Sequence, residues 1–240
     1  MRHPAHFALI HSPLVGAGSW RDVANLLRDR GHEVVVPSLS PAFDDGPPYH
    51  ARLVRRAAAS VARSAADRPI IVVGHSAAGA LLPAIAEAVI APALVVFADA
   101  VLPRAGKSWW DCASEERRRF LRTMVRGDRL LPWHEWFSAE GIAGHLPDPA
   151  ARAAFALETP RVPLAFFEEP APAAQLDGAR CVYWRWSQAY DETAREAELR
   201  GWKILHDNLD HLAMVSCAPR VASGLEEIFT KNAAWAPAQP

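Results

Sequence analysis

The sequence has few cysteines, almost no net charge and no long apolar run, and each shortage argues against a class of protein. Its three cysteines, Cys112, Cys181 and Cys217, are scattered without CxxC spacing, which argues against a disulfide framework and a metal site. The 26 basic and 27 acidic residues leave a formal net charge of −1, so no overall field favours nucleic acid or an anionic membrane. No apolar run approaches the roughly 18 to 20 residues that span a bilayer, and the first residues do not resemble a signal peptide. We therefore expect a cytoplasmic protein that binds neither nucleic acid nor membrane.

Short apolar runs alternate with helical patterns along most of the 240 residues, half of which are hydrophobic. This alternation predicts an α/β fold with a parallel sheet of about six strands and helices on both faces. The rhythm stops after the fourth strand, where residues 102–179 are rich in Trp, Phe and Pro and predict a mostly helical insertion without a clear β run. Residues 1–101 and 180–240 are expected to form the core domain. The expected strands cover residues 7–10, 33–36, 70–73, 93–98, 181–186 and 202–205.

The stretch from Ile70 to Gly79 carries the most informative pattern. Four apolar residues form a run typical of a buried parallel strand. The run breaks at Gly74, presents a hydroxyl at Ser76 and continues into a segment rich in Ala and Leu. Strand, sharp turn and helix are the context of a nucleophile elbow, in which a strained turn lifts a serine Oγ off the sheet. Small residues at Gly74 and Ala78 let such a turn close, although an ordinary Gly-Ser turn remains the alternative at this point.

A serine nucleophile needs a base, and the base needs an acid that orients it. The best base is His211, because a loop just past the last strand lies at the same sheet edge as Ser76. His206 competes with it but lies in or beside the strand. His75 adjoins the serine and is assigned to packing.

Two carboxylates follow strands at that edge and could orient His211. Asp191 follows the fifth strand and Asp99 ends the fourth. Asp191 is preferred, because it places the acid between serine and histidine in the chain and beyond the penultimate strand; Asp99 is the alternative. Asp210, directly before the histidine, is interpreted as a loop-capping residue.

The hexapeptide GHSAAG at residues 74–79, together with Asp191 and His211, resembles the α/β-hydrolase superfamily over essentially the whole chain. The likeness is strongest to small cofactor-free esterases and hydroxynitrile lyases, including actinobacterial-type relatives with a His-Ser-Pro-Leu-Val-Gly-like loop. The resemblance implies an α/β-hydrolase fold, a Ser-His-Asp triad, no cofactor, and a cap formed by residues 102–179.

The resemblance also implies an oxyanion hole made by two backbone N–H groups. One follows the nucleophile, at Ala77, and the other comes from the loop after the first strand. That loop begins His11-Ser12-Pro13 here, and proline has no N–H to donate. Leu14 is therefore the expected second donor, and otherwise the hole is half-formed. Because one lost donor costs about 100- to 1000-fold in turnover, chemistry other than hydrolysis stays open.

The aromatic residues of the insertion suggest the kind of substrate. Most Trp and Phe side chains at helical spacing form core, but a cap must also leave an apolar cavity over the serine. No dinucleotide fingerprint, P-loop or zinc spacing is present, so no cofactor or metal is expected. We predict a hydrolase for a carboxylic ester, thioester or lactone of a hydrophobic small molecule, with a lyase or cyclase of natural-product biosynthesis as the alternative. The expected pocket residues are His11, Ser12, Pro13, Trp109, Trp110, Trp133 and Trp136.

Overall fold

A six-stranded sheet, parallel at every pairing, forms the centre of the computed structural model, which describes residues 4–64, 68–89, 92–174, 176 and 181–232. The strand order is β2-β1-β3-β4-β7-β8. The six strands expected from the sequence are therefore confirmed, with bounds that differ by one or two residues. They are β1 (His6–Ile10), β2 (Glu33–Val35), β3 (Ile70–His75), β4 (Leu94–Ala98), β7 (Cys181–Arg185) and β8 (Lys203–His206).

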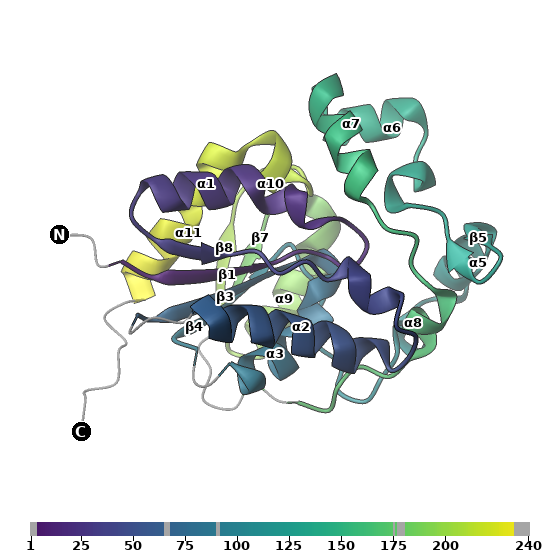
Figure 1. Ribbon diagram of the computed structural model, residues 1–240, viewed down its shortest axis with the longest axis horizontal. Helices are drawn as coiled ribbons and strands as arrows, with labels where there is room; N and C mark the ends of the chain where they lie inside the picture. The colour runs from purple at the N-terminus through teal and green to yellow at the C-terminus, as the bar shows by residue number, and fades with distance from the viewer. Residues whose placement is uncertain (1–3, 65–67, 90–91, 175, 177–180, 233–240) are drawn as a thin grey trace.

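Helices cover both faces of the sheet (Figure 1). Alternate residues of the central strands point to opposite faces, so Ile71 and Val73 pack on one side and Val72 on the other. Both faces are apolar because both are covered, as parallel sheets require. The first face carries α1 (Arg21–Asp29), α10 (Ala213–Ser216) and α11 (Ala218–Asn232), and the second carries α2 (Tyr49–Ser64), α3 (Leu82–Ala88) and α9 (Asp191–Leu199).

The chain between β4 and β7 forms the insertion, and its helices lie together at one end of the sheet (Figure 1). It also contains a short antiparallel pair, β5 (Val125–Arg126) and β6 (Arg129–Leu130), beside the helices that were expected there. Two residues per strand are too few to produce an alternating pattern in the sequence. The expected domain boundary at residues 179 and 180 lies outside the described residues. The helices are α4 (Trp109–Cys112), α5 (Glu115–Thr123), α6 (Ala139–His145), α7 (Pro149–Glu158) and α8 (Leu164–Glu168).

Two carboxylates of the insertion bind backbone N–H groups of the core. Glu158, at the end of α7, accepts a hydrogen bond from Gly18 N–H at 2.6 Å and pairs with the Arg21 guanidinium. Glu169 accepts from the first two N–H groups of α2 at 2.7 and 2.8 Å, where a helix N-terminus favours negative charge. The insertion is therefore held against elements on both faces of the sheet.

Short 3-10 helices form several of the turns that carry polar residues. They are η1 (Ala17–Trp20), η2 (Ser40–Phe43), η3 (Ser76–Ala80), η4 (Trp133–Trp136) and η5 (Gln188–Tyr190). Across the described part of the chain, no helix has the length and apolar character needed to cross a membrane.

Candidate active site

Ser76 sits in a strained turn between β3 and η3. Its φ of 54° lies in the left-handed region that a residue with a side chain rarely adopts, as a nucleophile elbow requires. The turn packs closely on the chain after β4, where Val101 N–H donates to the Ser76 carbonyl at 3.0 Å. A Cβ at Gly79 would lie 2.0 Å from the Val101 oxygen, so only glycine allows this approach. The expected helix after the serine is thus a 3-10 turn followed by α3.

His211 lies between β8 and α10, with its imidazole beside the serine. Its Nε2 is 3.2 Å from Ser76 Oγ. The backbone carbonyl of His211 accepts a hydrogen bond from His75 Nε2 at 2.8 Å, which fixes the loop that carries the imidazole. The structure therefore brings together Ser76 and His211, as the sequence suggested.

Asp99, rather than Asp191, contacts the imidazole of His211. Asp99 Oδ2 lies 2.8 Å from His211 Nδ1, and the aspartate is fully buried. Its carboxylate also accepts hydrogen bonds from the backbone N–H groups of Trp186 and Ser187, at 2.9 and 3.0 Å, and from the Ser187 hydroxyl at 2.6 Å. These bonds orient Asp99 toward His211 from the end of β4, the strand next to β3.

The expectation that Asp191 orients the histidine is corrected by its position at the start of α9. Its carboxylate pairs with Arg185 Nε at 2.8 Å, and its side chain is 36% exposed. The chain turns through η5 after β7, and this turn carries Asp191 away from the strand end. Asp210, by contrast, caps its own loop as expected, because it accepts from Leu212 N–H at 2.8 Å. It also binds His145 Nδ1 of the insertion at 2.8 Å.

Two buried histidines hold the loops around the serine. Burial lowers the pKa of His75 well below its usual range, with the nearby His211 adding to the effect, so His75 is neutral and donates from Nε2. Burial also lowers the pKa of His11. Its Nδ1–H donates to the Ser12 carbonyl at 2.8 Å, and its Nε2 accepts from Leu39 N–H at 3.1 Å. The His11 ring is fully buried and braces the loop, which corrects its expected place in the pocket lining.

The loop after β1 uses its N–H groups internally. Pro13 has none, Leu14 N–H donates to Ser12 Oγ at 3.2 Å, and Val15 N–H donates to the Ser12 carbonyl at 3.0 Å. Leu14 was the expected oxyanion donor, and in the structure its N–H is engaged by Ser12 instead. Ser12 and Pro13 are buried in this loop. Ala77, the second residue of η3, stays a prediction as the other donor.

Of the four expected pocket tryptophans, Trp133 lies beside the imidazole. Its ring centroid is 6.4 Å from that of His211, and it packs edge-on against Phe137 and Phe155. The other three make contacts within the insertion. Trp109 packs against Phe167, Trp110 lies under the Arg122 guanidinium, and Trp136 donates from Nε1 to the Leu131 carbonyl at 2.8 Å.

Tyr190 is a site residue that the sequence reasoning missed. Its ring stacks on His211 with centroids 5.1 Å apart and planes 10° apart. Burial raises the pKa of Tyr190 to about 12, with smaller effects from Ser76, Asp99 and Arg117. Tyr190 directly precedes Asp191, so the sequence pointed to the correct segment and to the wrong residue in it.

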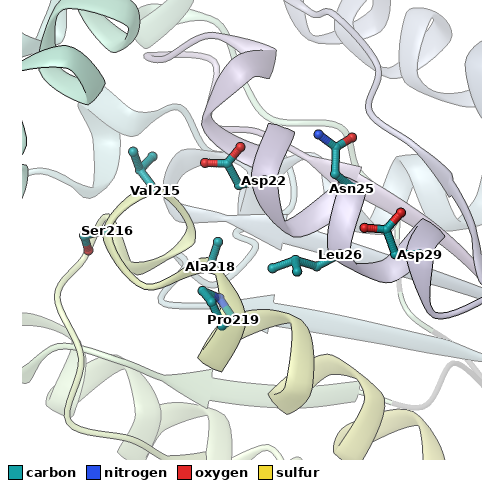
Figure 2. A pocket seen from close by; sticks show the side chains of 8 residues that line it. All are labelled: Asp22, Asn25, Leu26, Asp29, Val215, Ser216, Ala218 and Pro219. Atoms are coloured by element: carbon teal, nitrogen blue, oxygen red, sulfur yellow. The ribbon is translucent and has the colours of Figure 1, made fainter.

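A surface groove of about 410 Å³ lies at a different place, between α1 and the start of α11 (Figure 2). None of the residues that form it belongs to the Ser76 site. Among the described residues, no group of three or more His, Cys, Asp and Glu side chains is placed to hold a metal ion. The groove is lined by Asp22, Asn25, Leu26, Asp29, Val215, Ser216, Ala218 and Pro219.

Solved structures with the same fold include several hydrolases. An extracellular alpha/beta-hydrolase from a Paenibacillus species superposes with a TM-score of 0.72 at 20% identity, over 95% of this chain and 99% of that one. Tomato methylketone synthase I in complex with 2-tridecanone superposes with a TM-score of 0.69 at 17% sequence identity, over 95% of this chain and 99% of that one. A pyrethroid hydrolase from Sphingobium faniae JZ-2 superposes with a TM-score of 0.69 at 19% sequence identity, over 97% of this chain and 99% of that one. At these identities the likeness shows the fold alone.

The comparison with curated proteins found no match. The model of the alpha/beta hydrolase family, however, matches residues 7–223, which include the sheet, the insertion and the segment that carries His211. With Ser76 in a strained turn after β3 and an imidazole beside it, the chain belongs to the alpha/beta hydrolase family.

Proposed function

We propose that the protein is a serine hydrolase that cleaves a carboxylic ester, thioester or lactone through an acyl-Ser76 intermediate. The observation that carries the proposal is the hydrogen-bonded chain from Asp99 through His211 to Ser76, with contacts of 2.8 and 3.2 Å. An imidazole in this position takes the serine proton, and a carboxylate on its other nitrogen holds the required tautomer. The buried Asp99 suits that orienting role, because its other acceptor sites are already bonded to fixed donors.

The reaction on this site proceeds in two halves. Ser76 Oγ bonds to the substrate carbonyl carbon while its proton passes to His211 Nε2. His211 then gives that proton to the leaving oxygen or sulfur, and an acyl-Ser76 ester remains. A water molecule attacks the acyl carbon and gives a proton to His211, and the C–Oγ bond breaks as Oγ takes the proton back. Ala77 N–H, at the start of η3, is the proposed backbone donor to the carbonyl oxygen.

The surroundings of the histidine favour a hydrophobic substrate. Trp133, Phe137 and Phe155 form an aromatic group on the insertion, and Trp133 extends it to His211. Apolar side chains around a few fixed polar groups are typical of small-molecule sites. The proposed substrate is therefore an ester, thioester or lactone with an apolar acyl or leaving group.

A fluorophosphonate probe and a series of p-nitrophenyl esters test this function. Wild-type protein should be labelled and should release p-nitrophenol, with kcat/KM rising as the acyl chain lengthens. Ser76→Ala should lose both labelling and turnover, because no nucleophile remains. Ser60→Ala, on helix α2, is the matched control and should behave as wild type. Labelling that survives in Ser76→Ala would overturn the assignment of the nucleophile.

A non-hydrolytic lyase or cyclase is the second candidate, and the loop after β1 favours it. Residues 13–15 offer the carbonyl oxygen no unengaged N–H, since Pro13 has none and those of Leu14 and Val15 bond to Ser12. A protein whose Ser76 reacts with fluorophosphonate but which turns over no ester, thioester or lactone would support this candidate. Rapid ester turnover that depends on Ser76 would reject it.

A further inference from the structure

The side chains of His145 and Asp210 join the insertion to the loop that carries His211. His145 Nδ1 lies 2.8 and 3.0 Å from the two carboxylate oxygens of Asp210. Because an ionised carboxylate only accepts hydrogen bonds, Nδ1 carries a proton and donates it. Asp210 directly precedes His211, and its carboxylate also accepts from Leu212 N–H at 2.8 Å. The pair therefore fixes the insertion to a carboxylate that is itself held on both sides of His211.

The ring of His145 also packs against the aromatic group of the insertion. Phe137 meets it edge-on, with ring centroids 5.5 Å apart. The Trp133 ring centroid lies 6.3 Å from that of His145 and 6.4 Å from that of His211. Trp133 thus lies beside both imidazoles, and its place next to His211 depends on how closely α6 is held to the loop that carries Asp210.

His145 projects from a fixed turn at the end of α6. The Arg152 guanidinium, from α7, donates to the carbonyls of Leu146 and Pro147 directly after it, and the Leu146 side chain is buried. The side chains of His145 and Asp210 are 29% and 34% exposed. Pairs at such exposure add little to global stability, so the effect of this one is expected in the placement of the aromatic group.

We infer that His145 and Asp210 are positioning residues that hold Trp133 against His211, and that they thereby select substrates with an apolar acyl group. The inference rests on the proposed serine chemistry and adds a determinant of its substrate range. Without the pair, α6 and the Trp133 ring can move away from the imidazole, and a long acyl chain loses the surface on which it packs. A short acyl chain does not reach that surface, so its turnover does not depend on the pair.

His145→Ala tests this role with p-nitrophenyl octanoate and p-nitrophenyl acetate. The ratio of kcat/KM for octanoate to that for acetate should fall about tenfold, which is the scale on which apolar contacts in a pocket change selectivity. The fall should come from a higher KM for octanoate, with kcat for acetate close to wild type. His145→Asn places an amide N–H near the former Nδ1 and should restore most of the ratio, which separates the hydrogen bond from the packing of the ring.

A double-mutant cycle with Asp210→Ala shows whether His145 acts through this carboxylate. If it does, His145→Ala changes the ratio in wild type but has no further effect in the Asp210→Ala background. Arg104→Gln is the matched control, because it removes another link between the insertion and the core, a 2.6 Å pair with Glu196 on α9. It should keep the wild-type ratio.

Three results would overturn the inference: a wild-type ratio in His145→Ala, an equal loss of kcat on both esters, or the same His145→Ala effect in both backgrounds. Failure of the proposed function looks different, because wild-type Ser76 would then remain unlabelled by a fluorophosphonate. Hydrogen exchange of residues 133–145 tests the pair in that case as well, since local opening sets the exchange rate. Faster exchange in His145→Ala than in Arg104→Gln supports the positioning role, and equal rates reject it.

Discussion

Asp99 Oδ2 lies 2.8 Å from Nδ1 of His211 although 112 residues separate the two along the chain. The contact arises because β4 ends beside β3, the strand that carries Ser76, and because Asp99 leaves its strand with a φ of 44°. Two neighbouring strands thus end in left-handed residues, Ser76 and Asp99, that turn their side chains toward one imidazole. Such strain persists only where the surrounding structure enforces it, and it concentrates at functional sites.

The roles of the two aspartates predict opposite results on mutation. Asp99→Asn should lower kcat for a p-nitrophenyl ester by about 10³- to 10⁴-fold, because an amide cannot hold His211 in the proton-accepting tautomer. Asp191→Asn is the matched control and should leave kcat close to wild type, since it only weakens a partly exposed ion pair with Arg185 that does not contact His211. Circular dichroism should show both variants folded. If Asp191→Asn lowers kcat strongly while Asp99→Asn stays active, then Asp191 and not Asp99 orients His211.

The buried histidines predict a loss of stability in mild acid. Burial lowers the pKa of His75 and of His11 below the usual value of 6.5. Below that pH, these two histidines are therefore protonated in the unfolded chain and neutral in the folded protein. The stability from these neutral rings is present above pH 6.5 and is lost as the pH falls below it. Urea unfolding at several pH values should show the free energy of unfolding decreasing over this range.

His75→Gln isolates one contribution to this acid loss. The glutamine amide can still donate to the His211 carbonyl but carries no titratable nitrogen, so the slope of unfolding free energy against pH should become shallower. His206→Gln, at an exposed position at the end of β8, is the matched control. An unchanged slope in His75→Gln would contradict the assignment of the acid loss to this ring.

The glycine after the nucleophile turn predicts a specific packing defect. A Cβ at Gly79 would lie 2.0 Å from the Val101 carbonyl oxygen, a backbone atom that cannot rotate away. Gly79→Ala should therefore lower the free energy of unfolding by about 1 to 3 kcal/mol, the usual cost of overpacking. It should also slow fluorophosphonate labelling, because η3 begins at Ser76 and must shift.

Gly144 in α6 is the matched control for this substitution. A Cβ there would meet no atom within 4 Å. Gly144→Ala should leave labelling unchanged and raise stability by up to about 1 kcal/mol, because alanine favours a helix over glycine. Equal thermal stability of the two variants would show that the Val101 backbone moves away from the added Cβ at little cost in free energy, contrary to this prediction.

Local patterns determined most of the fold and half of the site. The six apolar runs predicted the six parallel strands because covered strands are apolar on both faces, and that pattern survives in a single sequence. Ser76 was recognisable because a strand, a small-residue turn and a helix occur together within ten residues. His211 followed because the ends of parallel strands share one edge of the sheet.

Only the tertiary structure decided which acid, which loop atoms and which aromatic rings surround the serine. Asp99 and Asp191 both follow strands, and the sequence does not show that η5 turns Asp191 toward Arg185 while β4 brings Asp99 to His211. Nor does it show that Ser12 engages the N–H of Leu14, or that Tyr190 stacks on the imidazole. No repeating pattern in the sequence predicts these contacts. They depend on the order of the strands in the sheet and on the geometry of the loops that follow them.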